Sequence, residues 1–177
     1  LVIDALRSAL IQLWSGRSGM NQFLFQPALA ELTADPITKV FQASVAVAIR
    51  HTELSAGEKD IGEKIVLSLC KQIRALTESR NEIAHGTWFI GWASADATDF
   101  SVANGLKPKN TKTGTLYRSI DRKKEDFDAL IDQCRLLRDI IQRFGLMLVM
   151  GERLGTFEKN FTWDEDRVSL TRSLWTF

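Results

Sequence analysis

Hydrophobic residues recur every three or four positions along most of this chain, the spacing that gathers them on one face of an α-helix. The pattern predicts two long helices, over residues 58–85 and 122–150, and three shorter ones before them, over residues 2–14, 20–32 and 35–50. In the last long helix, apolar side chains at seven-residue intervals and midway between them predict a seam that packs against another helix. The seam positions are Phe127, Leu130, Cys134, Leu137, Ile141, Phe144 and Leu148.

The pattern changes between the two long helices. Alternate positions in residues 88–92 carry Trp or Ile, as in a strand, and residues 115–120 favour extended backbone. Asn104-Gly105 readily supplies the positive φ angles of a tight hairpin turn. We therefore expect a small β-hairpin or β-meander insertion at about residues 87–120, before the last long helix.

These elements make the chain mainly α. We expect residues 1–150 to form an antiparallel helical bundle that carries the β insertion, and residues 151–177 to form a C-terminal extension. In that extension, Thr162-Trp163-Asp164-Glu165 fits a helix-capping box, whereas the residues from Val168 onward alternate as in a strand. The extension is therefore predicted to be a helix or a strand that packs on the bundle or on a partner.

The composition narrows the class of protein. With 45% hydrophobic and 25% charged residues over 177 positions, the chain can bury the core of one domain, which excludes a disordered protein. Cys70 and Cys134 are too few for a disulfide framework, so we expect reduced thiols in a cytoplasmic protein. No run of about 18 apolar residues occurs, so no membrane span is expected.

A net charge of +1 does not by itself indicate nucleic-acid binding, but one segment is strongly basic. Between positions 107 and 124, the cations outnumber a single acid, Asp121. This excess has two interpretations: a surface that contacts RNA phosphates, or a solvated hairpin and helix start. The candidate RNA-binding residues are Lys107, Lys109, Lys112, Arg118, Arg122, Lys123 and Lys124.

The most informative stretch is the end of the first long helix, Arg80-Asn81-Glu82-Ile83-Ala84-His85-Gly86. At about 100° per residue, Arg80 is predicted to project from the middle of the apolar face of that helix. A guanidinium is costly to bury alone, so this position implies a paired core arginine, a subunit interface or a bound anion. Asn81 and His85 lie four residues apart on the side of the helix next to this apolar face. Glu82 lies on the side of the helix opposite Leu69 and Ile73 and is expected to be solvated.

Arg80 and His85 form a pair suited to phosphodiester chemistry. The helix dipole favours the imidazolium form of a histidine in the last turn. An imidazole can move protons near neutral pH, and a permanently charged guanidinium neutralises the negative charge that grows on phosphate oxygens in the transition state. The pair is therefore a candidate site for phosphodiester chemistry.

This stretch resembles the motif of the HEPN (higher eukaryote and prokaryote nucleotide-binding) superfamily. In that motif an Arg, a polar residue that is commonly Asn, and a His after three further residues lie at the end of a long bundle helix. The resemblance covers about residues 1–150. It implies a homodimer in which Arg80 and His85 of both subunits line one composite cleft as the catalytic pair, with Asn81 helping to orient them.

The resemblance also implies an activity. Many HEPN proteins are metal-independent endoribonucleases of defence or toxin-type systems, in which the RNA 2′-OH attacks the adjacent phosphate. No metal or cofactor is then expected, and RNA and a cognate antitoxin or effector protein are the expected partners. The alternative function is a non-catalytic dimerisation or interaction module in which Arg80 and His85 are structural.

Two features indicate a divergent subfamily. In the toxins that are silenced by nucleotidylation, a Tyr lies two residues after the His, whereas this chain has Thr87. The β insertion is also not part of a minimal HEPN bundle. The aromatic residues after the motif, Trp88, Phe89 and Trp92, could stack on RNA bases, but we expect them to pack the hairpin on the bundle.

Overall fold

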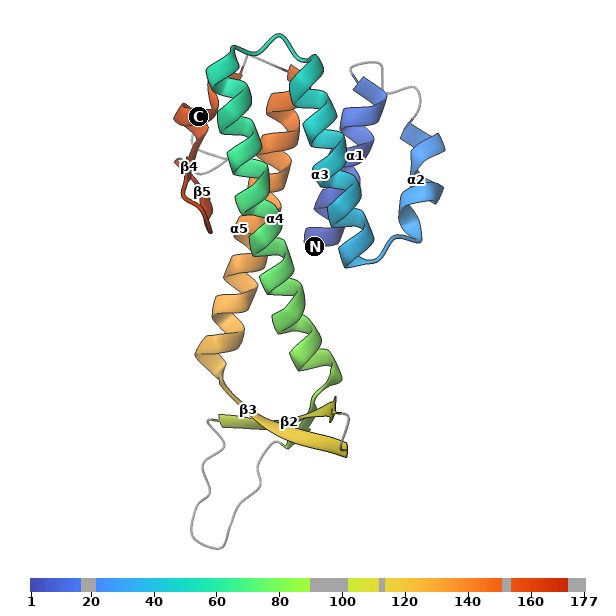
Figure 1. Cartoon of the computed structure of the whole chain (residues 1–177), viewed down its shortest axis with the longest axis vertical. Helices are drawn as coiled ribbons and strands as arrows, with labels where there is room; N and C mark the ends of the chain where they lie inside the picture. Colours follow the sequence, from blue (N-terminus) through green and yellow to red (C-terminus); the bar gives the residue numbers. More distant parts are fainter. Residues whose placement is uncertain (17–21, 90–101, 112–113, 151–153, 172–177) are drawn as a thin grey trace, which may run out of the picture. The chain divides into compact units, whose positions relative to one another are not determined.

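The computed structural model describes residues 1–16, 22–89, 102–111, 114–150 and 154–171. Within these residues the fold is mainly α with a small antiparallel β insertion (Figure 1). The helices are α1 (Val2–Ser15), α2 (Gln22–Ala30), α3 (Ala34–His51), α4 (Ala56–His85), α5 (Lys124–Met150) and α6 (Phe157–Asn160). The strands are β1 (Thr87–Phe89), β2 (Val102–Thr111), β3 (Gly114–Lys123), β4 (Phe161–Trp163) and β5 (Val168–Leu170). None of the described helices is long and apolar enough to cross a membrane.

The chain divides into two compact units. Unit 1 consists of Leu1–Arg74 and Cys134–Phe177, and unit 2 consists of Ala75–Gln133, so α4 and α5 each contribute to both units. Among the described residues, the buried apolar side chains belong to unit 1 except for Leu76 and Ile120. The hydrophobic core therefore lies in unit 1, whereas the β insertion and the Arg80–His85 stretch belong to unit 2.

The first three helices form one side of the unit 1 core. Helix α1 packs against both α2 and α3 (Figure 1). Four side chains of α3 at four-residue spacing are completely buried, because this spacing returns to nearly the same face of a helix. These side chains are Ile37, Phe41, Val45 and Ile49.

Three phenylalanines join the C-terminal extension to α5. Phe144 stacks on Phe157 with ring centroids 5.3 Å apart and meets the edge of Phe161 at 5.9 Å. All three rings are at most 2% exposed. The predicted packing seam of α5 is confirmed over its second half, where Leu137, Ile141, Phe144 and Leu148 are buried, while its first half is only partly covered.

The extension contains both a short helix and a β-hairpin. The strand pattern is confirmed over Val168–Leu170, while its continuation after Thr171 lies outside the described residues. The capping-box interpretation of residues 162–165 is wrong, because Trp163 ends β4 and Asp164 begins the turn to β5. The Asp164 carboxylate accepts the backbone N–H groups of Asp166 and Arg167. These two bonds lower the pKa of Asp164 and explain why an acid occupies this position.

The hairpin is anchored to α4 by residues far away in the sequence. The buried Gln72 side chain donates to the Val168 carbonyl over 3.3 Å. Lys71 donates to the Glu165 carbonyl over 2.8 Å and pairs with Asp166. These contacts hold the turn of the hairpin against the part of α4 that belongs to unit 1.

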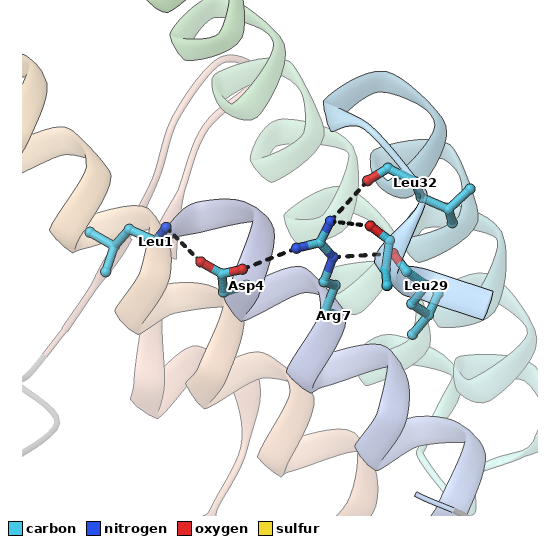
Figure 2. Close-up of polar contacts among 6 residues, drawn as sticks. Leu1, Asp4, Arg7, Leu29 and Leu32 are labelled. Carbon is cyan, nitrogen blue, oxygen red and sulfur yellow. Dashed lines mark hydrogen bonds and ion pairs between the residues drawn. The ribbon is translucent and has the colours of Figure 1, made fainter. Parts of the chain in front are cut away.

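Arg7 of α1 binds the end of α2. Its Nε donates to the Leu29 carbonyl over 3.1 Å, and its Nη2 donates to the carbonyls of Ala30 and Leu32 over 2.9 and 3.2 Å. Figure 2 shows these bonds together with the ion pair between Arg7 and Asp4 on the same helix. The last carbonyls of a helix have no partners within it, so Arg7 acts as the C-terminal cap of α2.

We expect Arg7→Met to lower the free energy of unfolding by about 1–3 kcal/mol, because a methionine keeps the apolar stem but removes the guanidinium donor from the carbonyls of Leu29, Ala30 and Leu32. Urea titration followed by circular dichroism measures the change. Arg50→Met removes an exposed guanidinium from α3 and serves as the matched control. Equal losses in the two variants would show that Arg7 contributes only as a surface charge.

The sheet of unit 2 has the order β1-β2-β3, with antiparallel neighbours. The predicted turn at Asn104-Gly105 is wrong, because both residues lie inside β2, where Gly105 pairs with Trp88 on one side and Ile120 on the other. A Cβ at Gly105 would lie 3.0 Å from the Trp88 ring and 3.1 Å from the Ile120 carbonyl. Glycine is therefore required here for close packing.

The insertion is also longer than predicted. β3 continues to Lys123, so α5 begins at Lys124 rather than at Arg122. The Asp126 carboxylate accepts the backbone N–H of Lys123 over 2.8 Å, which caps the start of the helix. The chain reversal between β2 and β3 falls between Thr111 and Gly114 instead of at residues 104–105.

Candidate functional site

The candidate site lies where α4 ends and the β insertion begins. The backbone N–H of Gly86 donates to the Glu82 carbonyl, and the indole N–H of Trp88 donates to the Ile83 carbonyl over 2.6 Å. The Trp88 ring also meets the edge of Phe127 with centroids 6.2 Å apart. The packing interpretation of Trp88 is thus confirmed, whereas Trp92 and the side chain of Phe89 lie outside the described residues.

Arg80 does not lie in the core. The apolar stripe of α4 is buried at Leu69, Ile73 and Leu76, but Arg80, one turn later, is exposed. Its Nη1 donates to Oδ1 of Asn81 over 3.1 Å, and no carboxylate pairs with it among the described residues. Of the three alternatives for Arg80, the paired core arginine is therefore wrong, whereas the subunit interface and the bound anion stay predictions. The periodicity gives the direction of a side chain around the helix, but it does not say how far along the axis other elements cover that face.

His85 is exposed at the same helix end, and Asn81, one turn before it, is half-buried. An accessible imidazole can exchange protons with a bound molecule, and the exposed guanidinium of Arg80 can attract an anion. The arrangement leaves both groups available to a ligand or to a second subunit.

Glu82 is the centre of a cluster of cations. Its carboxylate lies 3.8 Å from Lys107 Nζ, 3.7 Å from Arg118 Nη1 and 3.5 Å from Arg122 Nη2. The Glu82 side chain is only 20% exposed, so the expectation of a solvated residue is wrong. We call these four residues the Glu82 cluster. It carries one negative and three positive charges.

The register of the sheet explains the cluster. Lys107 pairs directly with Arg118 across β2 and β3, and Arg118, Ile120 and Arg122 alternate along β3, so all four project from one face. Ile120 is buried between the two arginines. Arg122 Nε is also buried and has no hydrogen-bond partner among the described residues. The cluster therefore contains a donor that its own carboxylate does not satisfy.

Two of the other candidate RNA-binding residues, Lys123 and Lys124, are not part of the cluster. Lys123 is exposed, and Lys124 is exposed and pairs with Asp128 of its own helix, which raises the pKa of Lys124. Lys112 and the side chain of Lys109 lie outside the described residues. The structure thus brings together three of the predicted cations and adds Glu82, which the sequence analysis did not include in the site.

Unit 1 contains a separate cavity of about 520 Å³ between α4 and the turn of the β4–β5 hairpin. Two of its cations, Lys64 and Lys71, already pair with Asp60 and Asp166, and none of the motif residues lines it. Cys70 also lines the cavity, and burial raises the pKa of its thiol to about 11, which keeps it protonated near neutral pH. No three His, Cys, Asp or Glu side chains in the described part of the chain are grouped to hold a metal ion.

Comparison of the chain with protein-family models, with curated proteins and with solved structures gives no match. The resemblance to the HEPN superfamily therefore depends on residues 80–86 and on the helical context of that stretch. The structure adds the positions of the candidate side chains in unit 2. Their exposure and charge determine what the site can bind.

Proposed function

We propose that this protein is a HEPN-like RNA-binding domain that cleaves RNA without a metal ion, using Arg80 and His85. The observation that carries the proposal is the charge around the end of α4. Three cations of the β insertion surround a single carboxylate within the motif, and Arg80 adds an exposed guanidinium two residues away. Such an excess of positive charge favours binding of a phosphate backbone.

The proposed reaction is an internal transfer at one phosphodiester bond. The 2′-oxygen of a ribose attacks the adjacent phosphorus, the bond from phosphorus to the 5′-oxygen of the next nucleotide breaks, and a 2′,3′-cyclic phosphate remains. His85 takes the proton from the 2′-OH or gives one to the leaving oxygen. Arg80 stabilises the additional negative charge on the phosphate oxygens in the transition state.

A homodimer fits this chemistry better than a monomer. One chain supplies one motif histidine, whereas the reaction uses a proton acceptor at one oxygen and a proton donor at another. Two copies of His85 in a composite cleft supply both roles. The exposure of Arg80 and His85 supports this part of the proposal, since both side chains are accessible to a second subunit.

The proposal is tested by incubating the purified protein with total RNA in excess EDTA and analysing the products on a gel. We expect cleavage that persists in EDTA and leaves 2′,3′-cyclic phosphate and 5′-hydroxyl ends, since no step uses a metal. Cleavage that EDTA abolishes would contradict the mechanism. RNA binding without cleavage would favour the non-catalytic interaction module.

A further inference from the structure

We propose that the Glu82 cluster is a phosphate-binding site whose anion position is occupied by the protein's own carboxylate. This inference rests on the proposed RNA binding and deepens it, because it identifies the residue that limits the affinity. In the absence of RNA, Glu82 holds Lys107, Arg118 and Arg122. When RNA binds, a backbone phosphate takes over these cations and Glu82 releases them.

The distances in the cluster support a carboxylate that is shared rather than tightly bound. The three nitrogen–oxygen distances lie between 3.5 and 3.8 Å, whereas charge-assisted hydrogen bonds are typically about 2.7–2.9 Å long. Both oxygens of Glu82 take part, Oε1 toward Lys107 and Arg118 and Oε2 toward Arg122. One carboxylate thus spans three cations and makes an ideal bond with none of them.

The hydrogen-bonding capacity of the cluster exceeds what a carboxylate offers. Arg122 Nε is a buried donor without a partner among the described residues, and such donors are rare in folded proteins because losing water costs free energy. A backbone phosphodiester carries one negative charge on two oxygens, as a carboxylate does, and suits the fork of a guanidinium. The cluster therefore keeps an unused donor at Arg122 that a backbone phosphate can accept.

The surroundings leave the cations accessible from solvent. The Arg118 side chain is 74% exposed, and those of Lys107 and Arg122 are 37% and 28% exposed. Asp121, which projects from the other face of β3, bonds to Ser119 and does not neutralise the cluster. A phosphate can thus approach Arg118 and Lys107 first while Glu82 remains in place.

The test compares the affinity of the wild type and of Glu82→Gln for a fluorescein-labelled single-stranded RNA, measured by fluorescence anisotropy between about 50 and 200 mM salt. Glutamine keeps the shape of the side chain and removes its charge. We expect Glu82→Gln to bind about tenfold more tightly and with a steeper salt dependence, because its cations no longer have an internal anion.

Glu78→Gln is the matched control, since Glu78 is an exposed acid one turn earlier on the same helix. If both variants gain affinity equally, the effect is one of net charge and the inference is wrong. Arg118→Ala is then made both in the wild type and in Glu82→Gln. We expect Arg118→Ala to reduce RNA affinity more in the Glu82→Gln background, because there Glu82 no longer competes with RNA for Arg118.

Failure of this inference can be distinguished from failure of the proposed function. Wild-type binding with an unchanged affinity in Glu82→Gln would overturn the role of Glu82 and retain RNA binding. The absence of RNA binding in the wild type and in Glu82→Gln would overturn both. Circular dichroism checks that Glu82→Gln is folded, and Glu82→Asp, which keeps the charge, is expected to bind RNA as the wild type does.

Discussion

Replacement of His85 by alanine is expected to reduce RNA cleavage by about 10²–10⁴-fold, because proton transfer by a positioned side chain contributes that much to a reaction of this kind. The remaining cleavage rate comes from charge stabilisation by Arg80 and from the positioning of the bound RNA. Since His85 is exposed and ends α4, its loss removes no core packing, and the protein should remain folded. The rate of cyclic-phosphate formation in EDTA measures the effect.

The other histidine of the chain, His51, provides the control. His51 is exposed at the end of α3, as His85 is exposed at the end of α4, but it lies in unit 1. His51→Ala should leave cleavage unchanged. A similar loss in both variants, or cleavage that survives His85→Ala undiminished, would contradict the assignment of proton transfer to His85. RNA affinity should change little in either variant, because binding depends on the cations.

The largest loss of stability is expected for Phe144→Ala. The Phe144 ring is fully buried and contacts two further phenylalanines. Its removal loses the free energy of burying the ring and leaves a cavity, and these two effects together lower the free energy of unfolding by about 3–5 kcal/mol. Single domains are stable by only about 5–15 kcal/mol, so this variant should be close to unfolding. Urea titration followed by circular dichroism gives the change in the free energy of unfolding.

Two variants make this prediction testable even if Phe144→Ala does not fold. Phe144→Leu keeps most of the volume and should lose about 1–1.5 kcal/mol. Tyr117→Ala removes an aromatic ring that is 68% exposed and should change stability by about 0.5 kcal/mol or less. A loss in Tyr117→Ala as large as that in Phe144→Leu would show that the phenylalanine cluster does not dominate the core.

The helices could be predicted from the sequence because their apolar spacing extends over many turns. The same holds for the second half of the α5 seam, from Leu137 to Leu148, and for the location of the β insertion. The bounds within the insertion could not be predicted. Asn104-Gly105 has the composition of a turn, but here the glycine provides room for Trp88, a requirement that depends on a residue 17 positions earlier.

Less of the candidate site follows from the sequence. Arg80, Asn81 and His85 are close in sequence at the end of one helix, but the spacing within that helix predicts a solvated Glu82, because it carries no information about strands that cover the helix end. The sequence pattern also predicts a helix at Arg122, where this residue would not share a face with Arg118. Once both residues lie in one strand, their four-residue spacing puts them on the same side, toward Glu82.

The attachment of the β4–β5 hairpin to α4 has a consequence for the order of folding. The bonds from Lys71 and Gln72 reach residues that are 94 to 96 positions later in the chain. Contacts of such long range form late, because a large loop must close first. During synthesis on the ribosome, the segment of α4 around these two residues therefore stays uncovered until more than 90 further residues have emerged.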